Sequence, residues 1–229
     1  RILNICTQTG CKLHILPDRV REMESKTSIL SHMRSVRVED LLGRDPVLLG
    51  GEGVREMIEG QTVLVTGGGG SIGSELCRQI ADMGPDRLII VDNYENTTYE
   101  LQQELKRKYG NTLDLRVEIA TIQDSSLIDA IFNKYSPDLV FHAAAHKHVP
   151  LMEDSPVEAV KNNVFGTWNV IQASDRYHVK KFVQISTDKA VNPTNIMGTT
   201  KRICEMMLSS MKDRSETEFV VVRFGNVLG

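Results

Sequence analysis

Short apolar runs alternate with longer amphipathic stretches from about residue 60 to the end of the chain. The runs lie at residues 63–65, 88–91, 115–119, 139–141, 182–185 and 219–222. The first, Val63-Leu-Val65, is continuous, as in a parallel strand buried on both faces. The amphipathic stretches predict helices at residues 71–83, 97–109, 126–134, 157–177 and 197–210. Strands that alternate with helices predict βαβ units. We therefore expect an α/β fold with a doubly wound parallel sheet of the Rossmann type.

The preceding part of the chain carries a weaker pattern. It predicts a helix end at 2–9 capped by Gly10, a strand at 12–16, a polar linker at 18–35, and an apolar stretch at 36–42 followed by a turn at 43–46. We expect residues 1–59 to be the tail of an upstream domain with a linker, and residues 60–229 to be the main domain.

Composition adds three constraints. Of the 229 residues, 41% are hydrophobic and 25% charged, the balance of a soluble globular protein. Lys and Arg number 27 against 30 Asp and Glu, so the net charge is 27 − 30 = −3, which argues against nucleic-acid or membrane binding driven by overall charge. The four cysteines show no C-x-x-C spacing, which predicts free thiols in a reducing, cytosolic compartment without a structural metal.

The ends of the chain suggest part of a longer protein. The first residue is Arg1, and no apolar run approaches the roughly 20 residues of a transmembrane helix. The last strand is followed by little sequence, so we expect a C-terminal lobe to be largely missing.

A glycine-rich loop follows the run at 63–65. The stretch Val65-Thr-Gly-Gly-Gly-Gly-Ser-Ile-Gly73 can be read as G-x-G-x-x-G or as G-x-x-G-x-x-G. Side chains here would hold the backbone away from a pyrophosphate, and the free N–H groups of the helix start would face that anion. A bare tight turn is the alternative, but the strand-loop-helix context favours dinucleotide binding. The expected contacts are Gly67, Gly70, Ser71, Ile72 and Gly73.

The next strand ends in Asp92, 19 residues after Gly73. An acid at this place binds the 2′-hydroxyl of the adenosine ribose and repels a 2′-phosphate. The sequence therefore favours NAD, while Arg or Lys elsewhere leaves NADP as an alternative.

Two other strand ends are polar, and ligands of open α/β sheets bind beyond the carboxyl ends of strands. After residues 139–141, Ala143, Ala144 and Ala145 are small enough for a flat cofactor to lie close. His146 and His148 have no acid or cysteine at ligand spacing, so they predict surface or substrate-contacting side chains and no metal site.

The second polar end is Ser186-Thr-Asp-Lys189. A buried lysine can act as a base and a desolvated aspartate as an acid. The alternative is a Thr-Asp pair that caps a helix beside a solvated lysine. On the next helix, Met197 and Lys201 share a face, from which Lys201 can reach a nucleotide ribose. Met197 by itself predicts packing.

Five ordered motifs resemble the extended short-chain dehydrogenase/reductase superfamily, and within it the nucleotide-sugar 4,6-dehydratases of the capsular-polysaccharide and protein-glycosylation type. The motifs are Thr66-Gly-Gly-Gly-Gly-Ser-Ile-Gly73, Phe141-His-Ala-Ala-Ala-His-Lys-His-Val-Pro150, Asn162-Asn-Val-Phe-Gly-Thr167, Ser186-Thr-Asp-Lys-Ala-Val191 and Arg223-Phe-Gly-Asn-Val-Leu-Gly229. The resemblance covers about residues 60–229 and marks them as an NAD(P)-binding catalytic domain.

Two departures from the family pattern are informative. The usual Tyr-x-x-x-Lys pair appears as Met197-Gly-Thr-Thr-Lys201, a replacement typical of the long, membrane-anchored branch of these dehydratases. The usual Gly-Asp-Ile-x-Asp appears as Ala120-Thr-Ile-Gln-Asp124. The adenine contact of the family's Asp is thus in doubt at Thr121, while Ile122 is expected to pack on the ring.

The resemblance implies a UDP-N-acetylhexosamine substrate, UDP-N-acetylglucosamine first. Hydride would pass from C4 to NAD, water would leave across C5 and C6, and hydride would return to C6. The resemblance also implies a homo-oligomer at the cytoplasmic side of the membrane, in polysaccharide or glycan precursor biosynthesis. The alternatives are an NAD-dependent UDP-sugar epimerase and a catalytically silent NAD-binding module.

Residue roles follow from the same resemblance. Lys189 would be the base at C5, Asp188 the acid at C6, and Thr187 a hydrogen-bond partner of O4. Because Met197 cannot accept the O4 proton, that task falls to Thr187 with Asp188, or to a water. Lys201 would hold the nicotinamide ribose, and Lys147 and Asn226 would contact the sugar nucleotide.

Overall fold

The computed structural model describes residues 14–15, 34–35 and 52–227. By its contacts the chain divides into one unit of Arg1–Leu49 with Val227–Gly229 and another of Gly50–Asn226. In the first unit, β1 (His14–Ile15) pairs antiparallel with β2 (Arg34–Ser35). The end of the expected polar linker is therefore a strand, because Arg34–Ser35 gives β1 a partner. The predicted elements at 2–9, 36–42 and 43–46 lie outside the described residues.

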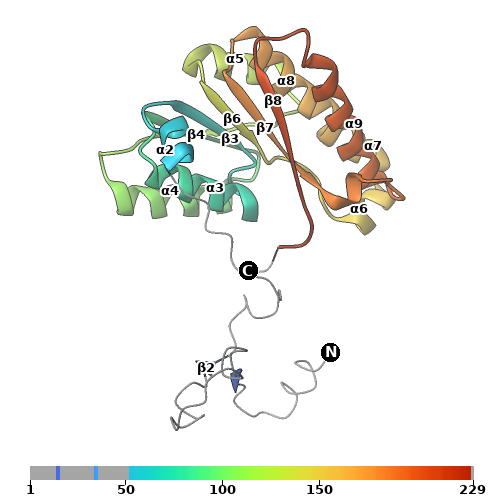
Figure 1. Cartoon of the computed structure of the whole chain (residues 1–229), viewed down its shortest axis with the longest axis horizontal. Coiled ribbons are helices and arrows are strands. Elements are labelled where there is room, and N and C mark those ends of the chain that lie inside the picture. Colours follow the sequence, from blue (N-terminus) through green and yellow to red (C-terminus); the bar gives the residue numbers. More distant parts are fainter. Residues whose placement is uncertain (1–13, 16–33, 36–51, 228–229) are drawn as a thin grey trace, which may run out of the picture. The chain divides into compact units, whose positions relative to one another are not determined.

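A six-stranded parallel sheet forms the centre of the second unit, with the order β5-β4-β3-β6-β7-β8 (Figure 1). The strands are β3 (Thr62–Thr66), β4 (Arg87–Asp92), β5 (Asp114–Ile119), β6 (Leu139–His142), β7 (Lys181–Thr187) and β8 (Glu218–Phe224). This is the strand order of a Rossmann fold, so the predicted doubly wound sheet is confirmed. The order reverses between β3 and β6, which opens a crevice at their carboxyl ends.

Helices cover both faces of the sheet (Figure 1). They are α2 (Glu52–Ile58), α3 (Ser71–Asp82), α4 (Glu95–Tyr109), α5 (Ser125–Tyr135), α6 (Val149–Asp154), α7 (Pro156–Ala159), α8 (Thr167–Arg176) and α9 (Ile196–Met211). Along β3, Val63 and Val65 pack with α3 and α4, whereas Leu64 packs with α5, α8 and α9. This packing on both faces explains why β3 and β4 are apolar along most of their length. Within the described residues no helix is both long and apolar enough to cross a membrane.

Three helical features differ from the sequence pattern. The helix predicted at 157–177 is divided, because a π-helix, η4 (Val160–Gly166), separates α7 from α8. α6 was not predicted, although Pro150 occupies its first turn, where proline is favoured. α2 was not predicted either, and its Ile58 is buried in the core with α3 and α4. The compact unit therefore begins before residue 60.

Candidate functional site

Glycines shape the turn between β3 and α3 at the crevice. Gly67 has a φ of +68°, and a Cβ on it would lie 2.5 Å from the backbone nitrogen of Ala144. A Cβ on Gly73 would lie 2.0 Å from the carbonyl oxygen of Gly67. Both clashes involve backbone, which cannot swing aside. Only glycine at these places lets the loop close against itself and against the end of β6.

The start of α3 presents its backbone N–H groups without competition. Gly70 is the N-cap, no side chain caps the helix, and its first turn has no acidic residue. Free N–H groups and the positive end of the helix dipole favour a bound pyrophosphate. Ser71, Ile72 and Gly73 open this helix, as the sequence predicted.

Asp92, the last residue of β4, ties two turns together. Its Oδ2 accepts the backbone N–H of Gly69 at 2.8 Å, and its Oδ1 accepts that of Tyr94 at 2.9 Å. Each carboxylate oxygen has two lone pairs, so both retain an acceptor position for a ribose hydroxyl. The carboxylate is thus held in place while still able to bind.

A cleft of about 440 Å³ runs along the glycine loop, Asp92 and the loop after β6. The predicted cofactor residues that line it are Gly67, Gly70, Ser71, Asp92, Ile122, Ala143, Ala144 and Ala145. A second cleft of about 290 Å³ shares the glycine loop and adds Ile72, Gly73, Leu151 and Met152. Together the clefts bring together all predicted cofactor residues except Lys201.

Charged side chains are few in these clefts. Among the described residues that line them, Lys147 is the one lysine or arginine, and it lies with Gly70 and Ser71 in both clefts. His146 and His148 also line both clefts. Within the described part of the chain no group of three His, Cys, Asp or Glu side chains is placed to hold a metal. Lys147 therefore stands at the end of the clefts that the glycine loop forms.

Asn163 fastens the loop after β6, a role that the sequence pattern did not predict. Its Oδ1 accepts the backbone N–H of His146 at 2.8 Å, and its Nδ2 donates to the His146 carbonyl at 3.0 Å and to Thr200 Oγ1 at 3.0 Å. Asn162, its neighbour in the π-helix, is also buried and lines the first cleft. The consecutive Asn-Asn was the available signal.

Ile122 closes the first cleft at the end of β5. A Cβ on Gly166 would lie 2.7 Å from its Cδ1, so the π-helix packs directly on this side chain. Asn169 Nδ2 donates to the Ile122 carbonyl at 3.0 Å. Thr121, which replaces the family's aspartate, accepts the Gln123 N–H at 3.2 Å and thereby closes the turn.

Thr187, Asp188, Lys189 and Asn226 form a second group, where β7 and β8 end. Lys189 Nζ lies 3.2 Å from Asp188 Oδ1 and 3.4 Å from Asn226 Oδ1. Thr187 Oγ1 donates to Asp188 Oδ1 at 2.9 Å. Thr187 also accepts the Lys189 N–H and caps the short helix η5 (Asp188–Ala190). The structure brings these four residues together, but they line neither cleft.

The expected desolvation of this pair is not observed. The side chain of Asp188 is 59% exposed and that of Lys189 36% exposed. The Thr187 hydroxyl and then the Lys189 ammonium lower the pKa of Asp188. Asp188 is therefore a carboxylate at neutral pH and needs a supplied proton before it can act as an acid. Helix capping by Thr187 coexists with this pairing.

Lys201 and Met197 of α9 are both buried. Lys201 Nζ donates to the Ile185 carbonyl at 2.9 Å, and burial lowers its pKa. Met197 packs in a small apolar cluster with Met152 and Ala159. Because Met152 lines the second cleft, Met197 lies directly behind that cleft wall. α9 thus contacts the wall of the second cleft through Met197 and the end of β7 through Lys201.

A buried row of polar side chains, which joins β3, β6 and α8, was not predicted from the sequence. His142 ends β6 fully buried, with its Nδ1 2.6 Å from Thr66 Oγ1 and its Nε2 2.9 Å from Thr167 Oγ1. Burial, and then the charge of Lys201, lower the pKa of His142 to about 3, so the ring is neutral. A histidine that ends an apolar run was the signal in the sequence.

Comparison with known proteins places this geometry in a family. A sequence model of the polysaccharide biosynthesis protein family matches residues 63–229. The capsular polysaccharide biosynthesis protein CapD of Staphylococcus aureus is 48% identical over 229 residues, all of this chain and 38% of that protein. A UDP-N-acetylglucosamine 4,6-dehydratase (inverting) of Campylobacter jejuni is 34% identical over 177 residues, 76% of this chain and 51% of that protein. A UDP-glucose 4-epimerase of Rickettsia rickettsii is 36% identical over 178 residues, which are 75% of this chain and 50% of that protein.

Two solved structures share the fold. Pen from Bacillus thuringiensis aligns with a TM-score of 0.69 and 36% identity, over 75% of this chain and 52% of its own. The UDP-glucose 4-epimerase of Thermus thermophilus, in complex with NAD, aligns with a TM-score of 0.65 and 25% identity. The alignment covers 73% of this chain and 56% of that chain. The chain thus spans between about a third and three fifths of the proteins it matches.

Proposed function

Because the chain belongs to the polysaccharide biosynthesis protein family, of the extended short-chain dehydrogenase/reductase type, we propose that it acts as a UDP-N-acetylglucosamine 4,6-dehydratase with NAD. The observation that carries the proposal is the Asp188–Lys189 pair at the end of β7, with 3.2 Å between Oδ1 and Nζ. Elimination of water needs an acid and a base on one substrate, and this pair offers both.

The cofactor cleft fits NAD. The glycine loop leaves space that a Cβ would fill, the start of α3 offers free N–H groups, and Asp92 keeps acceptor positions for a ribose. A carboxylate there repels the 2′-phosphate of NADP. Lys147, the one cation of the described cleft lining, lies with Gly70 and Ser71 of the phosphate loop. These features support NAD over NADP.

Bound NAD would supply reversible hydride removal at C4 and hydride return at C6. The chain's own residues then have to move two protons, one from O4 to O6 and one away from C5 and back. Thr187 would take the O4 proton and pass it to Asp188 Oδ1, to which its hydroxyl already donates at 2.9 Å. This relay would supply the proton that the exposed Asp188 carboxylate lacks, and it replaces the tyrosine whose place Met197 occupies.

The following steps balance. Lys189, after its ammonium proton has passed to solvent, takes the C5 proton, Asp188 gives its proton to O6, the C6–O bond breaks, and water leaves. Lys189 returns its proton to C5 when C6 receives hydride. Both side chains end as they began, and the sugar has lost one water. Lys201 would hold the nicotinamide ribose, and Asn226 would contact the sugar nucleotide beside Lys189.

Incubation of the protein with UDP-N-acetylglucosamine and NAD, with the product identified by mass and NMR, tests the activity. A dehydratase yields a 4-keto sugar lighter by one water. An epimerase, the activity named for the Rickettsia relative, yields a product of unchanged mass. A silent module binds NAD and forms no product. Homo-oligomer formation and a place at the cytoplasmic side of the membrane stay predictions of the family resemblance.

The role of Lys189 is tested by Lys189→Ala with deuterium wash-in at C5 of the sugar. We expect C5 exchange and turnover to be lost together. Lys212→Ala, an exposed lysine after α9, is the control. Undiminished exchange in Lys189→Ala would remove Lys189 as the base.

A further inference from the structure

Glu205 is a buried carboxylate with three side-chain partners. Its side chain is 5% exposed, and it accepts hydrogen bonds from Ser186 Oγ at 2.7 Å, Arg223 Nε at 2.7 Å and Arg202 Nη1 at 3.1 Å. Burial opposes its ionisation, but the hydrogen bonds from Arg223, Ser186 and Arg202 outweigh burial and lower its pKa to about 2. It is therefore charged across the neutral range.

Two of these partners face each other across the sheet. Ser186 of β7 is in register with Arg223 of β8, so Glu205 joins the two strands at one level. The next paired residues are Thr187 and Phe224, after which both strands end. The carboxylate thus holds both strands one residue before they enter the site.

One face of α9 fastens the end of β7 twice. Glu205 binds the Ser186 hydroxyl, and Lys201, one turn earlier, binds the Ile185 carbonyl at 2.9 Å. Beyond these anchors the strand ends meet again, where Lys189 Nζ reaches Asn226 Oδ1 at 3.4 Å. A Cβ on Gly225 would lie 3.4 Å from Asp188 Oδ2, so the β8 end also limits the space around that carboxylate.

We propose that Glu205 is a positioning residue that, through Ser186 and Arg223, sets Asp188 and Lys189 against Asn226. This inference rests on the proposed function, in which Asp188 and Lys189 are the acid and base. Glu205 itself touches no substrate. Its loss is expected to lower kcat by about 10- to 100-fold, since misplacement of catalytic groups by about 1 Å has effects of this order. KM and NAD affinity are expected to change little.

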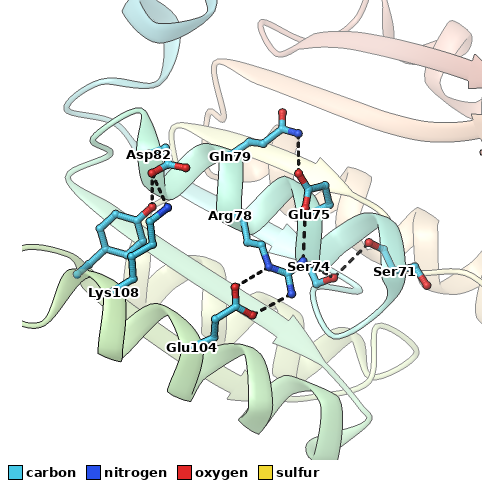
Figure 2. Close-up of polar contacts among 9 residues, drawn as sticks. Ser71, Ser74, Glu75, Arg78, Gln79, Asp82, Glu104 and Lys108 are labelled. Atoms are coloured by element: carbon cyan, nitrogen blue, oxygen red, sulfur yellow. Dashed lines mark hydrogen bonds and ion pairs between the residues drawn. The ribbon is translucent and has the colours of Figure 1, made fainter. Parts of the chain in front are cut away.

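The chain offers a matched control. Arg78 and Glu104 form a second two-pronged pair, at 2.8 and 2.9 Å, between α3 and α4 (Figure 2). It contacts neither β7 nor β8. Glu104→Gln therefore removes an Arg–Glu pair without disturbing the strand ends, whereas Glu205→Gln removes the pair that anchors them.

The experiment measures kcat, KM, NAD affinity and thermal unfolding for Glu205→Gln, Glu205→Asp and Glu104→Gln. We expect kcat to fall in Glu205→Gln, to recover in part in Glu205→Asp, which keeps the charge, and to stay at the unsubstituted level in Glu104→Gln. An unchanged kcat in Glu205→Gln overturns the proposal. So does a loss of NAD affinity in proportion to kcat, since that marks a general defect of the fold.

Amide hydrogen–deuterium exchange gives a readout that needs no turnover. We expect residues 185–191 to exchange faster in Glu205→Gln than in Glu104→Gln, while α3 is unchanged in the former. Equal exchange in both variants contradicts the positioning role. If the unsubstituted protein binds NAD but converts no sugar nucleotide, the proposed function fails, and the exchange comparison alone decides whether Glu205 orders the strand ends.

Discussion

The carboxylate of Asp92 accepts the backbone N–H of Gly69, with 2.8 Å between Oδ2 and nitrogen. Asp92 ends β4, yet its side chain holds the glycine loop that follows β3. Since Oδ1 accepts the Tyr94 N–H as well, both oxygens are needed as acceptors. Loop shape and the proposed contact with the ribose would therefore depend on the same carboxylate.

Asp92→Asn is expected to weaken NAD binding by about 10- to 100-fold, because hydrogen bonds to a charged group contribute about 1.5–3 kcal/mol. The new amide can accept from one of the two N–H groups but presents a donor to the other. NADP should lose less, because the repulsion of its 2′-phosphate disappears. Calorimetric titration with both cofactors measures the ratio.

Asp82→Asn is the control for this change. Asp82 lies at the other end of α3, where it accepts hydrogen bonds from Lys108 and Tyr109 (Figure 2), and it lines neither cleft. An NAD to NADP affinity ratio that Asp92→Asn leaves unchanged would show that this carboxylate does not select the cofactor.

Gly73→Ala is expected to reduce the free energy of unfolding by about 3 kcal/mol, within the range of severe strain or overpacking. Its Cβ would lie 2.0 Å from the Gly67 carbonyl, so the loop must move and NAD binding should be lost with it. Denaturant unfolding and NAD titration check both. Gly53→Ala, in α2 with open space around it, should stabilise by about 0.5–1 kcal/mol. Equal effects of the two variants would refute the close approach.

Asn163→Ala is expected to lower stability by about 2 kcal/mol, because the backbone N–H and carbonyl of His146 would lose their partner. The loop that carries Ala143–Ala145 would loosen, so NAD affinity should fall by about tenfold, or 1.4 kcal/mol. Thermal unfolding and NAD titration measure the two effects. Gln79→Ala, an exposed side chain bonded to Glu75 (Figure 2), should change neither. Wild-type NAD affinity in Asn163→Ala would contradict the anchoring role.

The central strands could be predicted because β3, β4 and β6 are buried on both faces, which leaves apolar runs that the local pattern shows directly. Val63–Val65 is such a run, and its neighbours in β4 and β6 read in the same way. The π-helix could not be predicted, since its wider turn depends on Gly166 packing against Ile122, a contact between distant parts of the chain.

The candidate site likewise has parts that local sequence predicts and parts that depend on contacts between distant residues. The glycine loop and Asp92 follow from spacing along the chain, so their assembly around one cleft was predictable. The surroundings of Asp188 were not, because exposure depends on which elements fold over a strand end. Glu205 carries no local signal, since a glutamate on a helix is ordinarily a solvated residue until Ser186 and Arg223 are brought to it.

Met197→Tyr, which restores the family's usual residue, is expected to lower the free energy of unfolding by about 1–3 kcal/mol. Met197 is buried against Met152 and Ala159, so a larger ring overfills that cluster. Met206→Tyr, 59% exposed on the same helix, should remain within about 0.5 kcal/mol of the unsubstituted protein. Denaturant unfolding decides, and equal stability of both variants would show that the cluster has room for a tyrosine.

His142 makes the fold sensitive to mild acid. Burial lowers its pKa to about 3 in the folded chain, against an ordinary value of 6.5. Below pH 6.5 the unfolded chain binds a proton that the folded chain refuses, so stability is complete above that pH and falls as the pH is lowered toward 3. Between pH 7 and 5 the expected loss is about 2 kcal/mol. Glu205 does not contribute to the loss in this window. Its pKa is lowered from 4.5 to about 2, so the stability that its ionised form gives the fold is lost only below pH 4.5.

Denaturant unfolding at pH 7, 6 and 5 measures this slope. His142→Asn should be less stable at pH 7, because Thr66 or Thr167 loses a partner, but its stability should decline less toward pH 5. His178→Asn is the control: its side chain is 78% exposed and its backbone has a φ of 55°, which asparagine tolerates. The control should keep the full slope. If His142→Asn keeps it too, the acid sensitivity arises elsewhere, and the ring between Thr66 and Thr167 must take up a proton in the folded protein.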